Sequence, residues 1–198
     1  MSKYEEMKQI RDEIINLTIS PLYTYRTENK FLPVIGEGNH DASIVFIGEA
    51  PGKNEALTGK PFCGASGKVL DQLLSNVGIV RNDVYITNIV KDRPQDNRDP
   101  KLEEIDLYAP FLLRQIDIIK PKIIATLGRF SMDFIMKSFG LNNQIESISK
   151  IHGKTFTINT SWGEILFVPL YHPAVAVYNR SQLDELKKDF EILKTYII

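Results

Sequence analysis

The chain has 198 residues, which is long enough for one domain with a full hydrophobic core. Its 24 basic and 25 acidic residues nearly cancel, which is weak evidence against a nucleic-acid partner because local patches matter more than the sum, and its one cysteine excludes a disulfide framework. No apolar run is long enough to span a membrane and the charged N-terminus has no signal-peptide core, so we expect a cytoplasmic protein.

Helices and strands are predicted along most of the chain. A first helix covers residues 3–17, where apolar residues recur at helical spacing, and residues 18–41, with two prolines and two glycines, are expected to be irregular. Strands are predicted over 43–48, 84–90, 122–128, 154–159 and 164–170. Further helices are predicted over 66–78, 101–120 and 129–139, and from the SQLD stretch at 181–184, which resembles a capping box. Pro110 is expected to kink or split the helix that contains it.

The alternation of apolar strands with helices predicts an α/β fold. Continuous apolar strands are typical of a parallel sheet covered on both faces. We therefore expect a single domain over 1–198, with three α/β/α layers and a central, mainly parallel sheet. Ligands of such sheets bind at the carboxyl ends of the strands. Three polar residues stand at these ends, namely Glu49, Asn88 and His172.

The connection GEAPGKNEALTGKPFCG, residues 48–64, is much longer than a strand-to-helix connection needs to be. Long ordered loops at strand ends are typical of binding sites. Each polar residue taken alone also has an ordinary interpretation: Asn88 as a capping residue, His172 as a structural histidine and Cys63 as a small buried side chain. Only the combination of several loops distinguishes these interpretations.

Four loops together resemble the uracil-DNA glycosylase superfamily. They read GEAPGKNEALTGKPFCGASGKVLDQLL, YITNIVKDRPQDNRDPKLEEI, APFLLRQIDIIKPKIIATLG and YHPAVAV, and the resemblance covers about residues 17–196. The chain is most similar to the type-4 branch, whose members normally carry an iron–sulphur cluster. The resemblance implies a monomeric DNA repair enzyme that flips uracil out of DNA and hydrolyses its N-glycosidic bond, which leaves an abasic site. The implied partner is uracil-containing DNA.

The resemblance also implies a pocket for the flipped base. Phe62 would stack on the base, while the Asn88 amide would accept from uracil N3–H and donate to O4, a pattern that rejects cytosine. Glu55 would lie beside uracil C5 and leave no room for the thymine methyl; its ordinary interpretation is a solvated loop carboxylate. Ala50 and Gly52 belong to the same expected base-binding set.

The chemistry would depend on two residues of the matching motifs. His172 would donate a hydrogen bond to O2 of the leaving uracil as negative charge develops there. Glu49 would position or activate the attacking water. The fastest enzymes of the superfamily have an aspartate where this chain has Ala50, which predicts slower chemistry rather than none.

A further group of residues is expected to contact DNA. Amides at the start of the helix after the long loop suit a phosphate, basic residues on the rim would meet phosphates, and apolar residues of PAVAV (173–177) would fill the gap left by the base. Each basic residue is otherwise an ordinary surface charge. The group comprises Gly64, Ser66, Gly67, Lys91, Arg93, Arg98, Ala174, Val175 and Arg180.

The cysteines that hold the cluster in type-4 relatives have no counterparts here. The matching positions read Leu17, Ser20, Asp92 and Tyr108. We therefore expect no iron–sulphur cluster and no other cofactor, with apolar packing and hydrogen bonds in its place and Asp92 paired with an arginine or capping a turn. His40 and His152 have no partners at metal-ligand spacing, so no metal site is predicted.

Two other interpretations stay open at the level of the sequence. A catalytically weak or silent protein that binds DNA or uracil-containing strands would fit the missing cluster and Ala50, although such a binder does not need the leaving-group donor His172. An unrelated nucleotide-binding α/β protein would need a G-x-G-x-x-G or P-loop spacing after the first strand, and the 48–64 loop has neither.

Overall fold

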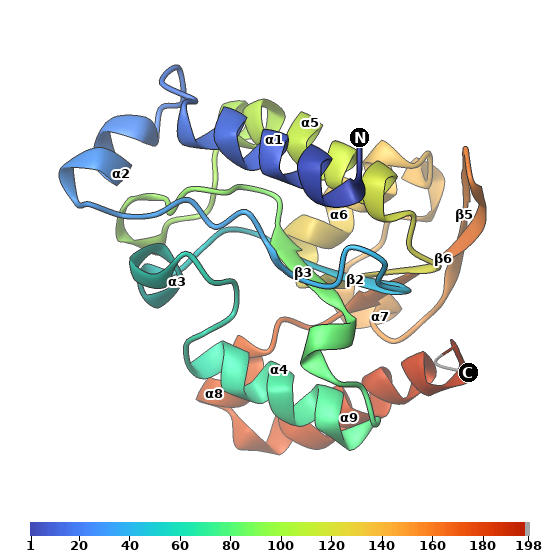
Figure 1. Cartoon of the computed structure of the whole chain (residues 1–198). Helices are drawn as coiled ribbons and strands as arrows, with labels where there is room; N and C mark the ends of the chain where they lie inside the picture. The colour runs from blue at the N-terminus through green and yellow to red at the C-terminus, as the bar shows by residue number, and fades with distance from the viewer. Residues whose placement is uncertain (197–198) are drawn as a thin grey trace.

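The computed structural model describes residues 1–196, and within them six strands form one sheet in the order β1-β3-β2-β4-β6-β5 (Figure 1). The four inner strands are parallel, and the two edge strands are antiparallel to their neighbours. In sheet order the strands are β1 (Glu37–Gly38), β3 (Tyr85–Asn88), β2 (Ile44–Gly48), β4 (Ile123–Leu127), β6 (Gly163–Leu170) and β5 (Phe156–Thr160). This arrangement confirms the predicted mainly parallel sheet.

Helices cover both faces of the sheet, which confirms the three layers (Figure 1). One face carries α1 (Lys3–Ile15), α5 (Leu102–Ile119), α6 (Arg129–Ser138) and α7 (Ile148–Ile151). The other carries α4 (Ala65–Asn76), α8 (Ala174–Tyr178) and α9 (Leu183–Phe190). Side chains of β2 alternate between the two cores, with Ile44 and Phe46 beside α4 and α9 and with Val45 and Ile47 on the side of α1 and α5.

Shorter elements complete the described part of the chain. Two short helices, α2 (Tyr23–Glu28) and α3 (Lys53–Thr58), lie at one end of the sheet (Figure 1). Turns of 3-10 helix are found at Arg81–Asp83, Gln95–Asn97, Asn142–Gln144, Arg180–Gln182 and Glu191–Tyr196. Among residues 1–196, no helix combines the length and the apolar character that a bilayer crossing requires.

Two local predictions were wrong, and one of the two effects expected of Pro110 is absent. Residues 18–41 contain α2 and β1, which are too short to produce a periodic sequence pattern. Pro110 does not split α5, because it lies on an exposed side of the helix, where water can satisfy the carbonyl that loses its partner. SQLD does not cap α9; instead Asn179 accepts a hydrogen bond from the Ser181 amide at the start of the preceding 3-10 turn.

A buried polar network joins the N-terminal segment to the loop after β3. Arg26 pairs with Asp92 at 3.0 Å and donates to the carbonyls of Ile14 and Ile15. The Tyr108 hydroxyl donates to Asp92 at 2.5 Å and lies 2.9 Å from the Ser20 hydroxyl. Burial raises the pKa of Asp92, while the Tyr108 hydroxyl and the Arg26 guanidinium oppose this shift by stabilising the carboxylate.

This network occupies the positions that correspond to the cluster cysteines. The Tyr108 hydroxyl bridges Ser20 and Asp92, and Leu17 packs against the same core. The expected pairing of Asp92 with an arginine and the expected hydrogen bonds at these positions are therefore confirmed. Within the described chain, these hydrogen bonds and the Arg26–Asp92 pair tie the N-terminal segment to the loop after β3.

We expect Asp92→Asn to lower the free energy of unfolding by roughly 3–5 kcal/mol, because it leaves the buried Arg26 guanidinium without its counter-charge. Glu13→Gln is the matched control, since it removes one partner of the half-exposed Arg114–Glu13 pair and should cost at most about 1 kcal/mol. Urea unfolding of both variants measures the difference. Equal losses in the two variants would contradict a structural role for the network.

Candidate active site

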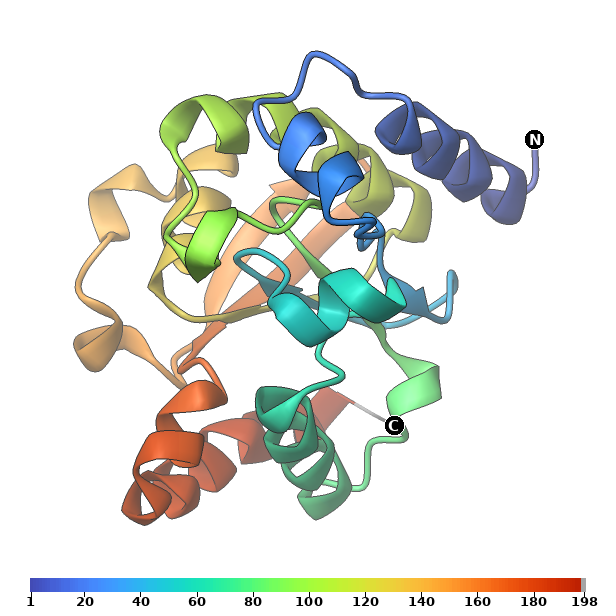
Figure 2. The same cartoon turned by 90° about the vertical axis from the view of Figure 1, so that its left-hand side faces the viewer.

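The carboxyl ends of β2, β3 and β6 open onto a cavity of about 360 Å³. Figure 2 shows this end of the sheet, with α3 in turquoise in front of it and α4 below α3. The connections that follow these three strands contribute to the cavity wall, as expected for a parallel sheet. The lining residues are Ala50, Gly52, Glu55, Phe62, Ser66, Asn88, Asn97, His172 and Ala174.

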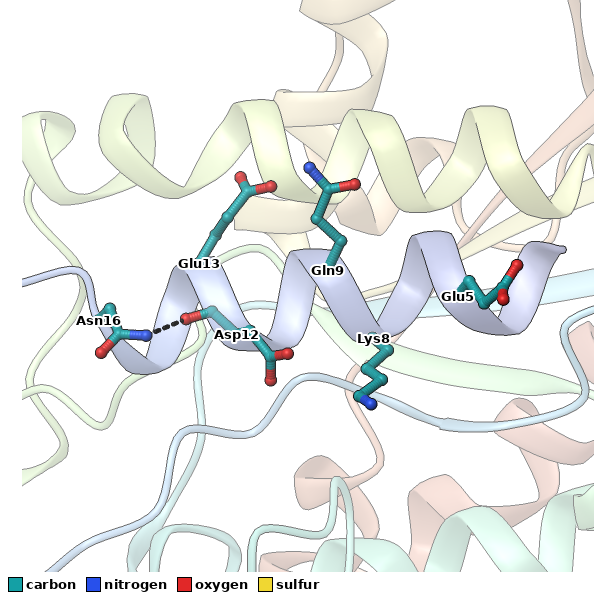
Figure 3. Close-up of a pocket in the computed structure, with 6 residues that line it drawn as sticks. All are labelled: Glu5, Lys8, Gln9, Asp12, Glu13 and Asn16. Carbon is teal, nitrogen blue, oxygen red and sulfur yellow. Dashed lines mark hydrogen bonds between the residues drawn. The ribbon is translucent and has the colours of Figure 1, made fainter. Parts of the chain in front are cut away.

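A larger hollow of about 530 Å³ lies on the outward side of α1. Figure 3 shows its six polar side chains, which all come from that one helix. A single helix cannot surround a ligand, and a converging set of polar groups from several elements is what marks a binding site. The cavity at the carboxyl ends of the strands is therefore the candidate site.

Gly48 lets two side chains of the cavity meet at the end of β2. A Cβ at this position would lie 2.3 Å from Asn88 Oδ1 and 2.8 Å from the Phe62 ring. Contacts this short are forbidden, so only glycine allows the amide and the ring to approach each other across the strand end. The Asn88 amide forms no hydrogen bond with another residue among those described, and it is thus available to a ligand.

Phe62 is held in a backbone conformation that is unusual for a residue with a side chain, with φ of +46°. Two features hold it there. A Cβ at Gly67 would lie 1.8 Å from the Phe62 carbonyl oxygen, so the chain can pack here only against glycine. Arg81, paired with Asp71, donates to the carbonyls of Pro61 and Phe62 at 2.7 and 3.2 Å.

His172 is a neutral hydrogen-bond donor to the cavity. Its Nδ1 accepts from the Ala174 amide at 3.1 Å, so the ring proton is on Nε2. Burial lowers the pKa of His172 to about 4, only weakly opposed by the charge of Glu55. The ring lies 5.6 Å from the Phe62 ring, centroid to centroid.

Glu49 follows β2 directly beside the cavity-lining Ala50. Burial raises the pKa of its carboxyl to about 7; Asp99 adds to this shift and Arg129 opposes it. Asp99 comes from the loop after β3 and Arg129 from the start of α6, after β4. Arg129 Nη2 lies 3.5 Å from Asp99 Oδ2. Glu49 is therefore divided between its acid and carboxylate forms near neutral pH.

Glu55 braces the long loop across the cavity mouth. Its Oε1 accepts from the backbone amides of Cys63 and Gly64 at 2.9 and 3.0 Å. A Cβ at Gly52 would lie 2.7 Å from its Oε2, so this part of the loop also depends on a glycine. The carboxylate is thus fixed in the cavity wall, which is not the environment of a solvated loop side chain.

The residues expected to contact DNA have different environments. Gly64 precedes α4, but its amide is already bonded to Glu55; Ser66 lines the cavity, and Gly67 is buried against Phe62. Ala174 lines the cavity too, whereas Val175 packs partly into the core beside α4. Arg180 is exposed. Helix α4 does begin beside the cavity, as predicted, and a phosphate contact there stays a prediction.

The rim position predicted for Lys91 was wrong. Its side chain is 0% exposed and donates to Thr87, Asn88 and Gln115. A strand-end lysine looks like a surface charge in the sequence, and only the packing of α5 against β3 encloses it. Two arginines of the same loop are engaged as well: Arg93 donates to the Tyr25 hydroxyl and Arg98 forms a two-point pair with Glu104.

Four functional candidates were not singled out from the sequence. Asn97 lines the cavity with a left-handed backbone, φ of +54°, and Arg81 supports Phe62. Arg129 stands at the end of β4 beside Glu49, and Tyr178, at the end of α8, is 90% exposed. The NR-x-P motif was a usable signal for Asn97. Arg81 and Arg129 are recognisable only from their spatial neighbours, and Tyr178 only from its exposure.

Among residues 1–196, no three His, Cys, Asp or Glu side chains are grouped so that they can hold a metal ion. Cys63 is exposed on the long loop, 3.3 Å from the Thr58 hydroxyl. His152 is bonded to Asp189 at 2.7 Å, away from the cavity lining. The polar groups of the cavity are thus those of protein side chains and backbone.

Comparisons with known proteins agree with this geometry. The family described as "Uracil DNA glycosylase superfamily" matches residues 35–194. A protein of Sulfurisphaera tokodaii named type-4 uracil-DNA glycosylase is 43% identical over 98% of this chain and 86% of its own length. Proteins of the same name from Saccharolobus solfataricus and Thermotoga maritima are 44% and 39% identical, over 96% and 99% of this chain and 86% and 97% of their own lengths.

Proposed function

Because the chain belongs to the uracil-DNA glycosylase superfamily, we propose that it flips uracil out of DNA into the cavity and hydrolyses the bond between uracil N1 and the sugar C1′. The products are free uracil and an abasic site. One observation carries the proposal: a stacking ring, a base-reading amide and a neutral imidazole donor, from Phe62, Asn88 and His172, converge in a single cavity.

Recognition of uracil relies on Asn88 and Phe62. The unpartnered Asn88 amide accepts from uracil N3–H and donates to O4, and cytosine presents the opposite pattern at these two positions. The Phe62 ring supplies a flat apolar wall for the base. Glu55, fixed by two backbone amides, occupies the space that the methyl group of thymine would need.

His172 stabilises the leaving group. As the N-glycosidic bond breaks, negative charge develops on uracil O2, and the Nε2–H of His172 donates to that oxygen. A neutral imidazole serves this purpose because its proton is held by the tautomer that the Ala174 amide selects. No proton has to be transferred for uracil to leave as an anion, and solvent protonates it later.

Glu49 acts on the sugar side of the bond. In its carboxylate form it orients a water molecule toward C1′ and favours the positive charge that develops on the sugar. Ala50 offers no second carboxylate at the neighbouring position, so we propose a slower reaction than in relatives with an aspartate there. All of these groups come from one chain, and we propose that a cytoplasmic monomer is sufficient.

A silent DNA-binding protein is the less favoured alternative. A binder of uracil-containing strands needs Phe62 and Asn88, but it has no use for a leaving-group donor with a fixed tautomer or for a carboxyl buried beside the cavity. Both features are present. Their joint presence supports hydrolysis over binding alone.

We also propose that the chain folds without an iron–sulphur cluster. Such clusters are held by thiolates, and the one cysteine, Cys63, is on the long loop and not at the positions of the cluster ligands. Tyr108 bonds to both Ser20 and Asp92, and Asp92 also pairs with Arg26, so the side-chain oxygens of these three residues are already engaged. Oxygen ligands are in any case poorly suited to iron–sulphur chemistry.

We expect the protein to release free uracil from a uracil-containing oligonucleotide in the presence of EDTA, because the proposed chemistry uses protein groups and water. Under single-turnover conditions, His172→Ala should slow release on the order of 10² or more. His152→Ala is the matched control, since this histidine is bonded to Asp189 outside the cavity. No uracil release by the wild-type protein, or equal rates in the two variants, would reject the proposal.

The single-turnover rate should rise with pH, with a midpoint near 7, and level off well above that pH. The reason is that the Glu49 carboxylate is the active form and burial raises its pKa to about 7. His172 stays neutral over this range. Arg129→Gln should move the midpoint to higher pH, because Arg129 opposes the rise in the pKa of Glu49. Asp99→Asn should move it to lower pH, because Asp99 adds to that rise. A flat profile between about pH 5 and 9 would contradict the role of Glu49.

The purified protein is expected to be colourless and to contain no stoichiometric iron, because it lacks thiolates at the cluster positions. Metal analysis and the visible absorption spectrum of protein prepared with iron and sulphide supplied measure this directly. A brown protein with several iron atoms per chain would overturn the cluster-free assignment while leaving the glycosylase proposal intact.

A further inference from the structure

Lys91 has a fully buried ammonium group beneath the floor of the cavity. Its Nζ donates to the Thr87 hydroxyl at 2.7 Å, to the Asn88 carbonyl at 2.8 Å and to Gln115 Oε1 at 2.6 Å. A buried lysine is rare unless it is paired, and none of these three acceptors is charged. Burying this cation therefore costs free energy that its three neutral acceptors only partly offset.

The hydrogen-bond inventory identifies the charged form of Lys91. The Thr87 hydroxyl donates its proton to the Ile35 carbonyl, and the Gln115 amide NH₂ donates to Ile35 and to the Tyr85 hydroxyl. Both groups, like the Asn88 carbonyl, can only accept from Lys91. Three donated bonds require all three protons of an ammonium, although burial by itself lowers the pKa of Lys91.

The contact with Asn88 fixes the backbone at the end of β3. On the β2 side, the next residue, Ile89, is anchored through its amide to the Gly48 carbonyl. On the opposite side, β1 pairs only with Tyr85 and Ile86, so it ends before Asn88. Lys91 supplies a donor to the Asn88 carbonyl beyond the end of β1. Its own carbonyl accepts from the Val34 amide at 2.7 Å, which holds the preceding segment in place.

The side chain of Asn88 has no such support of its own. No hydrogen bond holds its amide among the described residues, and its Oδ1 lies beside the Phe62 ring in the space that the missing Cβ of Gly48 leaves free. The direction of the amide is therefore set by the backbone from which it projects. A small rotation of that backbone would move both the acceptor and the donor that uracil needs.

We propose that Lys91 is a positioning residue for uracil recognition: its buried ammonium fixes the Asn88 backbone so that the amide faces the base. This inference depends on the proposed glycosylase function. It assigns to Lys91 a part in specificity that neither its sequence position nor a phosphate contact would suggest.

The test compares Lys91→Met with Tyr85→Phe. The first removes the ammonium at similar volume, and the second removes the far end of the same network, at the Gln115–Tyr85 contact, without touching Asn88. The measurements are single-turnover release of uracil and of cytosine, and the affinity for an oligonucleotide with a non-cleavable 2′-fluoro-deoxyuridine. We expect Lys91→Met to slow uracil release by roughly 10²-fold and to weaken binding of this analogue. The ratio of the rate of uracil release to the rate of cytosine release should also fall. Tyr85→Phe should keep that ratio.

Each outcome has a distinct meaning. If the wild-type protein releases no uracil, the proposed function fails and the inference fails with it. If it does, but folded Lys91→Met keeps the wild-type rate, affinity and ratio, Lys91 is only structural and the inference is overturned. If Lys91→Met does not fold, Thr87→Val is tested instead, because it removes one of the three acceptors of Lys91. An unchanged ratio of uracil to cytosine release and an unchanged affinity for the analogue overturn the inference. A smaller ratio together with a weaker affinity supports it.

Discussion

The close approach of Phe62 and Asn88 at the end of β2 is the constraint on which the rest of the site depends. Gly48 permits it, because any Cβ there would overlap both side chains. Glycine is required at position 67 for the same reason, because a Cβ there would overlap the Phe62 carbonyl. The glycines at 48 and 67 thus allow close packing within the protein itself, and the cavity proposed to bind the base is the space that this packing leaves open.

Two buried polar networks hold the surroundings of this pocket in place. The network of Arg26, Asp92, Tyr108 and Ser20 joins the N-terminal segment to the loop after β3. The network around Lys91 joins the end of β3 to α5 and to Ile35. Burying such groups is tolerated only when every donor and acceptor is satisfied. Among residues 1–196, the Thr126 hydroxyl is the single side-chain polar group fully closed off from solvent that lacks a partner, whereas the Asn88 amide is open to the cavity. The satisfied networks specify one arrangement of the loops.

Burial shifts the pKa values of the two proposed catalytic side chains in opposite directions. It raises the pKa of Glu49 and lowers that of His172, and in both cases it disfavours the charged form. For His172 this leaves the neutral donor that the proposed leaving-group stabilisation requires. For Glu49 it opposes the carboxylate form that the proposed activation of water requires, and Arg129 partly compensates. Asp99 and Arg129 therefore shift the pKa of Glu49 in opposite directions.

The sequence by itself determined the α/β class, the order of the inner strands and main helices along the chain, and the positions of Glu49, Asn88 and His172 at strand ends. These follow from local periodicity and from motifs whose residues are close together in the chain. The sequence could not determine which charged residues are exposed, because exposure depends on elements far apart in the chain. Lys91 is enclosed by Gln115 of α5, and Asp92 meets Arg26 of α2, contacts that span 24 and 66 positions. Only the tertiary structure, which brings these segments together, decided that both residues are buried in the interior.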